Sequence, residues 1–196
     1  MRPACRRRAA RIDWAAAASP ALAAAYDELI GAGRWNRRAG VGGTVAVRFP
    51  SEEYPGEVGY HIEGNWRAGH EYWTNVRSRG RGLLALFLFS DIGADDAPTR
   101  LIAGSHLVVP PVLAPAGEEG MAGVDVAARL RPSVLCRHAA EATGWAGDVY
   151  LCHPFIVHTA AWPHRRFAIS YDRMASPRSS TASADHRASA GGRNVE

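Results

Sequence analysis

The stretch AGDVYLCHPFIVHT, residues 146–159, is the most informative part of the chain. A Gly-Asp step followed by a short apolar run is typical of a turn that leads into a buried β-strand. The stretch carries two histidines, His153 and His158, with Pro154 between them. Proline interrupts the hydrogen-bond ladder of a strand, so alternation cannot tell which ring faces the interior. Each histidine is therefore a candidate ligand, and a hydrogen-bonded core residue is the ordinary alternative.

Short runs rich in β-branched and aromatic residues recur on both sides of this stretch. Gly, Pro and Asp separate them, which predicts strands over residues 44–49, 57–63, 83–89, 99–103, 149–153, 155–158 and 166–171. A helix is predicted from Ser19-Pro20 to about residue 30, and a second within residues 108–130. Many short strands with few helices favour a mainly β fold, a sandwich or jelly roll with flanking helices.

The segment YHIEG, residues 60–64, contains a second group of candidate ligands. His61 and Glu63 are two residues apart in a strand-like segment, so both side chains point to one face. One imidazole nitrogen and one carboxylate oxygen make two of the three ligands in the two-His, one-carboxylate site of non-haem Fe(II). The third ligand must come from elsewhere in the chain. The ordinary alternative is two polar residues on the solvent face of a strand.

An arginine pair, Arg165-Arg166, precedes the apolar run that follows His158. A guanidinium at the start of a buried strand can hold a carboxylate in a bidentate pair, although a surface arginine is the commoner case. The arginine-rich segment 75–81 is interpreted as a solvated loop or strand edge, with binding of a substrate anion as the alternative.

Composition narrows the classes of protein. A chain of 196 residues with 47% hydrophobic content fits one compact domain. All 23 basic residues are arginine, which excludes a lysine Schiff base and a P-loop. Three cysteines without a CxxC pair disfavour a disulfide framework or a structural zinc site, and a cytoplasmic location is expected. No run approaches the roughly 18 apolar residues of a membrane helix.

The net charge of +4 comes from the two ends of the chain. Residues 1–11 hold five Arg and no acid, and residues 173–196 hold four Arg and two acids, which leaves 14 Arg and 17 acids between them. Clustered cations on the folded part are therefore not expected, and nucleic acid is disfavoured as a partner. We expect a loose basic N-terminus over residues 1–12, a single domain over 13–175 and a disordered tail over 176–196.

Taken together, the motifs resemble those of the phytanoyl-CoA dioxygenase family of Fe(II)/2-oxoglutarate-dependent oxygenases. The family carries His-x-Asp followed by Gly, a Pro-Gly-Ser-His-like step, Gly-Asp-x4-His-Pro-x3-His, and an Arg that opens the next strand. Here these are matched by residues 61–64, 103–106, 147–158 and Arg166. The resemblance covers roughly residues 43–172. Its most specific part, His-Pro-x3-His, selects His158 as the ligand and leaves His153 a structural residue.

The resemblance implies a double-stranded β-helix, the jelly roll of cupins, with Fe(II) held by His61, Glu63 and His158. It also implies 2-oxoglutarate as co-substrate and O₂ as oxidant, with hydroxylation of a small molecule and decarboxylation of 2-oxoglutarate to succinate. The distal carboxylate of the co-substrate would pair with Arg166, or with Arg165 if the turn is shifted by one residue. Further candidates are two co-substrate contacts, Thr99 and Arg48, and three substrate-pocket residues, Phe87, Trp66 and Trp73.

One departure from the family pattern concerns Glu63, where the family usually has Asp. Glutamate is one methylene longer and can still ligate if the strand or the rotamer adjusts. Two alternatives remain open at this point: a non-catalytic jelly roll that binds a ligand, and a cupin-like metal enzyme that does not use 2-oxoglutarate. Packing in the core is an equally ordinary role for the two tryptophans, Trp66 and Trp73.

Overall fold

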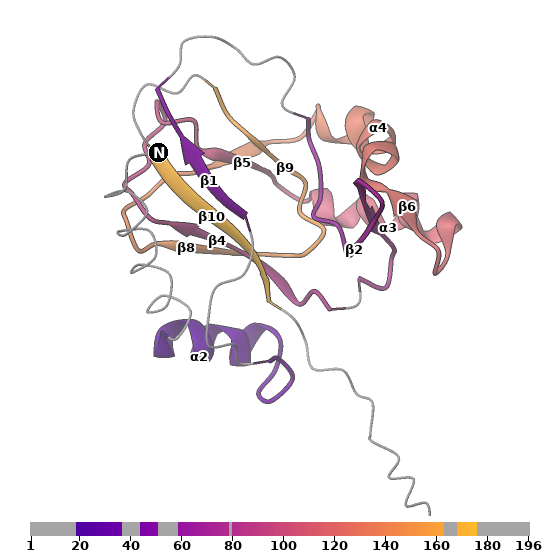
Figure 1. Ribbon diagram of the computed structural model, residues 1–196, viewed down its shortest axis with the longest axis horizontal. Helices are drawn as coiled ribbons and strands as arrows, with labels where there is room; N and C mark the ends of the chain where they lie inside the picture. Colours follow the sequence, from indigo (N-terminus) through magenta and orange to yellow (C-terminus); the bar gives the residue numbers. More distant parts are fainter. Residues whose placement is uncertain (1–18, 37–43, 51–58, 79, 163–167, 176–196) are drawn as a thin grey trace, which may run out of the picture.

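The computed structural model describes residues 19–36, 44–50, 59–78, 80–162 and 168–175 (Figure 1). Two of the described strands, β1 (Thr44–Arg48) and β10 (Ala168–Ala175), are described by their backbone alone. Within these residues the protein is mostly β, with small antiparallel sheets and a few helices and no closed barrel. The predicted mainly β class with flanking helices is therefore confirmed.

Two of the sheets face each other. The first has the order β1-β10-β4-β8, where β4 is Leu83–Leu88 and β8 is Val149–Cys152. The second has the order β7-β5-β9, formed by Ala139–Ala142, Thr99–Ile102 and His158–Ala160. His61 extends this second sheet, because it forms an antiparallel bridge with His158. A third, smaller sheet joins β2 (Trp66–Ala68), β3 (Glu71–Thr74) and β6 (Met121–Ala122).

The strand pairs of the two facing sheets are nested in the sequence. The innermost pair is β5 with β7, the next is β4 with β8, the third joins His61 to His158, and the outermost is β1 with β10. All four are antiparallel, as in one long hairpin. Two further antiparallel pairs complete the sheets: β10–β4 joins the outermost pair to the pair β4–β8, and β5–β9 joins the His61–His158 pair to the pair β5–β7. The chain is thus a hairpin folded over into two layers.

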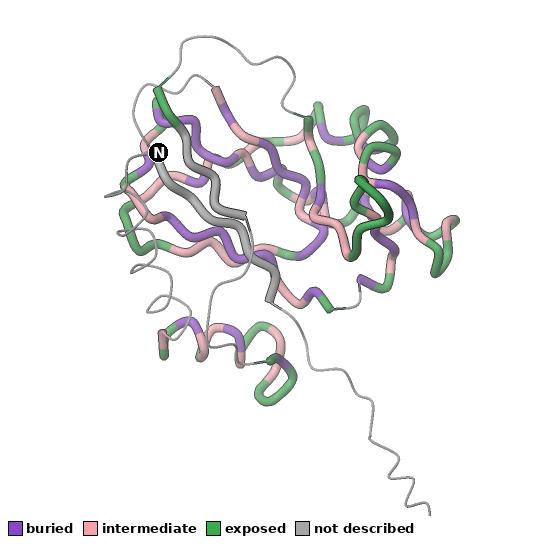
Figure 2. Tube along the Cα trace, viewed as in Figure 1, coloured by how far each residue is buried: buried purple, intermediate pink, exposed green. Residues whose placement is uncertain are grey.

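The core lies on both faces of β4, as the continuous burial along this strand shows (Figure 2). Leu86 and Leu88 pack with Leu101 of β5 between the two sheets. Ala85 and Phe87, which alternate with them, pack on the other face against Tyr26 and its neighbours in α2 (Pro20–Leu29). A strand that is covered on both faces has apolar residues at every position instead of at alternate ones, which explains the sequence LLALFL of β4.

Four further helical pieces cover the second sheet. They are α3 (Val109–Leu113), the 3₁₀ turns η1 (Ser105–Leu107) and η2 (Ala114–Ala116), and α4 (Gly123–Val134). Val126, Leu130 and Val134 recur at helical spacing and pack against Ile102 and Val157. None of the described helices has the length and apolarity needed to cross a membrane.

Five of the predicted strands correspond to observed ones, namely β1, β4, β5, β8 and β10, whereas β2, β3, β6 and β7 were not predicted. Helix α2 starts at Pro20 as predicted. In place of the single helix predicted within residues 108–130, the structure has two helices, α3 and α4. Helix α4 ends at Val134, beyond the predicted limit. The strand predicted over 155–158 is wrong, because β9 begins only at His158. Of the strand predicted over 57–63, the described part contributes a single bridge at His61.

Gly120 precedes β6 and provides a test of this packing. Its φ is +75°, and a Cβ there would meet the Thr74 carbonyl group and lie 3.1 Å from Asn75 Cβ. Gly117 has a φ of +57° with open space around it. Gly117→Ala should cost about 1–3 kcal/mol of unfolding free energy, because the backbone at this position, with φ +57° and ψ −143°, is one that glycine adopts far more readily than alanine. Gly120→Ala should cost roughly 1–3 kcal/mol more because of the clash. Denaturant unfolding of both variants measures the difference, and equal losses would contradict the packing described.

Candidate metal centre

His61, Glu63 and His158 come together although almost one hundred residues separate the first from the last. One ligand atom from each of them lies within 4.8 Å of the others. Two backbone hydrogen bonds create this arrangement: the His61 amide donates to the His158 carbonyl at 3.0 Å, and the His158 amide donates back at 2.9 Å. Directly opposed residues of an antiparallel pair project to the same face. The two imidazole rings accordingly lie 4.4 Å apart, centre to centre.

Glu63 joins the two rings because it is two residues beyond His61 in an extended segment. Ile62, between them, points the other way and is 5% exposed in the core under α3 and α4. Glu63 Oε1 lies 3.6 Å from His158 Nε2. The longer glutamate side chain therefore reaches the histidine pair. This group of three could hold a metal ion.

Hydrogen bonds of the backbone fix which nitrogen each imidazole offers. His61 Nδ1 lies 2.9 Å from the Gly59 carbonyl oxygen, and His158 Nδ1 lies 3.1 Å from the Ile156 carbonyl oxygen. A carbonyl oxygen only accepts, so each Nδ1 donates its proton. In the neutral ring the lone pair is then on Nε2, which is the usual way in which a protein orients a histidine ligand.

The charge states of the group also suit a cation. His158 is 3% exposed. Although His61 keeps contact with solvent, the surrounding protein, and then the neighbouring His158, lower the pKa of its imidazole. The interaction with the neighbouring His158 imidazole lowers the pKa of the Glu63 carboxyl. At neutral pH a neutral His61 imidazole and a carboxylate thus stand ready, and metal ions require deprotonated ligands of this kind.

The loop before His158 shows why the two histidines of the His-Pro-x3-His segment differ. His153 Nδ1 accepts the Phe155 amide at 3.0 Å, and the His153 carbonyl accepts the Ile156 amide at 2.9 Å. The centre of its ring lies 5.0 Å from that of His106, and His153 is not part of the group formed by His61, Glu63 and His158. His153 therefore shapes the turn, and His158 emerges from it as the first residue of β9.

Val157 is held on both sides, which fixes the backbone just before His158. The fully buried Ser105 hydroxyl accepts the Val157 amide at 2.8 Å, and the Val157 carbonyl accepts the Ile102 amide at 2.9 Å. The Ala103–His106 motif, noted above only as part of the family resemblance, thus supports the histidine ligand through its serine.

Arg81 is a functional candidate that sequence reasoning missed. The segment 75–81 was expected to be a solvated loop, yet Arg81 is 7% exposed. Its guanidinium donates to the Glu63 carbonyl, to the Thr74 hydroxyl at 2.8 Å and to the Ser78 hydroxyl at 3.0 Å. Burial lowers its pKa to about 10, so it remains protonated at neutral pH. Arg81 therefore fixes the backbone that carries Glu63 and places a positive charge near its carboxylate.

The remaining candidates have different positions. Thr99 is buried and shares a face of β5 with Leu101, which lies opposite His158. Phe87 packs against α2, on the face of β4 turned away from the second sheet. It therefore belongs to the hydrophobic core beneath α2 and does not form the wall of a pocket beside the triad. Arg166 and Arg165 lie outside the described residues, as does the side chain of Arg48.

Trp66 and Trp73 lie opposite each other in the hairpin of β2 and β3. This hairpin begins three residues after Glu63, and Trp66 is partly exposed, at 38%. A role for the pair in a substrate pocket stays a prediction.

Comparisons with protein-family models, with curated proteins and with solved structures gave no match to this chain.

Replacing the two histidines of the loop tests their different roles. His158→Ala should weaken anaerobic Fe(II) or Co(II) binding by more than about 100-fold, because a ligand is lost. His153→Ala should leave metal binding nearly unchanged and cost about 1–3 kcal/mol of stability, since the buried Phe155 amide loses its acceptor. Equilibrium dialysis and denaturant unfolding measure the two effects. Metal binding that survives the first change and not the second would identify His153 as the ligand.

Arg81→Met should lower the unfolding free energy by about 3–5 kcal/mol, since it removes a buried, hydrogen-bonded charge. Metal binding should also weaken by roughly 10-fold, because the Glu63 backbone loses its donor. Arg77→Met is the matched control: Arg77 pairs with Glu118 at 2.9 Å, and both side chains are more than half exposed. It should cost less than about 1 kcal/mol. Similar losses in the two variants would argue against the assigned role of Arg81.

Proposed function

We propose that this chain is an Fe(II)/2-oxoglutarate-dependent oxygenase of the phytanoyl-CoA dioxygenase type that hydroxylates a small molecule. The observation that carries the proposal is the convergence of His61, Glu63 and His158 with both Nδ1 atoms bound to backbone carbonyls. Two imidazoles and one carboxylate with open positions are the ligand set of non-haem Fe(II) oxygenases.

The topology supports a jelly roll as the scaffold. A jelly roll is a double-sheet sandwich of eight strands. With the His61 segment counted as the second strand, the nested pairs are first with eighth, second with seventh, third with sixth and fourth with fifth. This is the order obtained when one long antiparallel hairpin is rolled into two facing sheets. The metal ligands then come from the second and seventh strands, which are neighbours.

Each residue of the site has a defined task in this proposal. His61 and His158 would bind Fe(II) through Nε2, and Glu63 would add a carboxylate oxygen and a negative charge. When bound, Fe(II) with 2-oxoglutarate and O₂ would supply the oxidising power that converts a substrate C–H bond into C–OH, with release of succinate and CO₂. The Thr99 hydroxyl lies on the face of β5 shared by Leu101, opposite His158, and is a candidate donor to the co-substrate.

Arg166 is proposed to anchor the distal carboxylate of 2-oxoglutarate. It directly precedes Phe167 and the strand β10, which pairs with both β1 and β4 in the first sheet. A guanidinium holds a carboxylate through two parallel hydrogen bonds, which a lysine or a neutral side chain does not reproduce.

The direct experiment adds Fe(II) and 2-oxoglutarate to the full chain without oxygen. A weak visible absorption band should appear when the co-substrate chelates the metal, and Glu63→Ala should remove it. Admission of O₂ should then yield succinate. A folded, metal-loaded protein without the band would support a metal enzyme that does not use 2-oxoglutarate. A folded protein that binds no metal would support a non-catalytic relative.

Arg166→Ala should raise the 2-oxoglutarate concentration needed for half-maximal succinate formation by about 10–100-fold, the equivalent of one or two charge-assisted hydrogen bonds. Iron affinity should change little, because the residue is not a ligand. Arg165→Ala is the control and should have a small effect. The opposite order of the two variants would make Arg165 the anchor, and no effect in either would contradict the proposal.

A further inference from the structure

Three connections between strands lie at the end of the two facing sheets that holds the metal triad. One follows Glu63, one joins β5 to β7, and one joins β8 in the first sheet to His158 in the second. Antiparallel pairing puts the last residue of β8 and the first residues of β4 together, and it does the same for β5 and β7. The three connections span residues 64–82, 103–138 and 153–157. The polar side chains that they carry are therefore candidates for contacts to a ligand beside the triad.

Two histidines from different connections form a pair at this end. His106 lies in η1, the 3₁₀ turn that follows β5, and His153 directly follows β8. The centres of their rings are 5.0 Å apart, and the angle between the ring planes is 32°. His153 is exposed and His106 is half-buried, so a ligand from solvent can reach both rings.

The hydrogen bond inside the loop fixes what His153 offers to a ligand. Its Nδ1 accepts the Phe155 amide at 3.0 Å, so in the neutral ring the proton is on Nε2. A metal ion needs a lone pair on the nitrogen that it binds, and this Nε2 has none to give. It is instead a hydrogen-bond donor. Among the described residues Nε2 of His153 has no acceptor, and neither ring nitrogen of His106 has a hydrogen-bond partner.

Positive charge near the pair favours an anion as the ligand. The Arg81 guanidinium lies 5.5 Å from the centre of the Phe155 ring, and the centre of the His153 ring lies 5.6 Å from it. Burial, and then the neighbouring His106 and Arg81, lower the pKa of the His153 imidazole. Within the part of the chain that the structure describes, no carboxylate forms an ion pair with either histidine. An anion beside the two rings can accept hydrogen bonds from both, and the charge of Arg81 attracts it.

We propose that His106 and His153 form a binding site for a carboxylate. His153 donates from Nε2, and His106 donates from one of its ring nitrogens. A carboxylate matches the single charge of Arg81, whereas a phosphate dianion brings a second charge that no described group beside the pair balances. Under the proposed function, on which this step rests, the carboxylate belongs to the substrate, which is therefore a small organic acid. Binding itself needs no metal ion, because no residue of the triad takes part.

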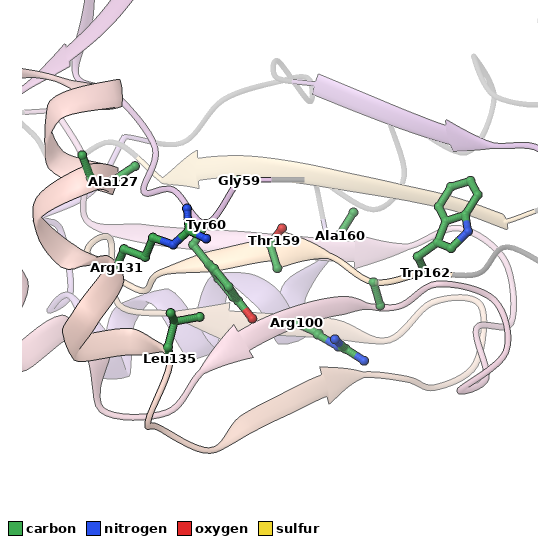
Figure 3. A pocket seen from close by; sticks show the side chains of 11 residues that line it. Gly59, Tyr60, Arg100, Ala127, Arg131, Leu135, Thr159, Ala160 and Trp162 are labelled. Carbon is green, nitrogen blue, oxygen red and sulfur yellow. The ribbon is translucent and has the colours of Figure 1, made fainter. Parts of the chain in front are cut away.

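A cleft of about 310 Å³ between the second sheet and α4 is a different place (Figure 3). Tyr60 and Thr159 line it, and they are the direct sequence neighbours of His61 and His158. Because successive strand residues point to opposite faces, the cleft and the triad lie on opposite sides of the sheet. Arginines also line the cleft, and a carboxylate can meet them there. A test of the histidine pair therefore has to observe the two rings directly.

The test adds acetate to the full chain at pH 7, with acetamide as a neutral match of the same shape. A chelator removes metal ions, so that no acetate binds through them. NMR of histidine-labelled protein should show saturable shifts of the His106 and His153 rings at roughly millimolar acetate, and acetamide should bind at least about 10-fold more weakly. Equal binding of the two compounds, or no shift of these rings, would overturn the proposal and leave the proposed oxygenase function untouched. Tighter binding of inorganic phosphate than of acetate would contradict the choice of a carboxylate.

Three variants locate the binding. His153→Asn removes the Nε2 donor and keeps, at Oδ1, an acceptor for the Phe155 amide, so the turn is retained. His106→Leu removes the second donor. Each should weaken acetate binding, observed at the remaining ring, by at least about 10-fold. Arg131→Gln removes a charge that lines the cleft and should leave binding unchanged. Undiminished binding in either histidine variant, or a loss of the same size in Arg131→Gln, would show that acetate binds elsewhere.

Discussion

The backbone pairing of His61 with His158 is the interaction on which the rest of the candidate site depends. Two hydrogen bonds place the residues opposite each other, and this alone sends both imidazoles to one face. The two-residue spacing then brings Glu63 to the same side. A one-residue slip of this pairing would turn one histidine to the opposite face and dissolve the group. The register of two short segments is thus the structural requirement for any metal chemistry here.

The surrounding structure holds that register from both sides. The loop before His158 is shaped by His153 and held at Val157 by Ser105 and Ile102, while Arg81 binds the Glu63 carbonyl. None of these groups belongs to the triad, yet each fixes a backbone atom next to a ligand. This is the arrangement by which proteins orient metal ligands in advance. The nested strand pairs beneath them bring the distant parts of the chain together.

Sequence reasoning reached the chemistry of His61 and Glu63, because strand periodicity is a local rule. It could not choose between His153 and His158 from spacing, since Pro154 interrupts that rule and the turn between them is set by side-chain hydrogen bonds. The burial of Arg81 was missed, because its acceptor at Glu63 lies 18 residues away. The position of Phe87 was missed for another reason: both faces of β4 are covered, so periodicity gives no hint of which face meets the second sheet.

The most direct measurement of the central claim is ¹⁵N NMR of the imidazoles in histidine-labelled protein, with Zn(II) as a diamagnetic substitute for Fe(II). Of the eight histidines, two should show a metal-induced shift at Nε2 and keep a proton on Nδ1, and His61→Ala and His158→Ala should each remove one of these signals. Metal-induced shifts at Nδ1, or shifts confined to other histidines, would contradict the assignment of the centre to His61, Glu63 and His158.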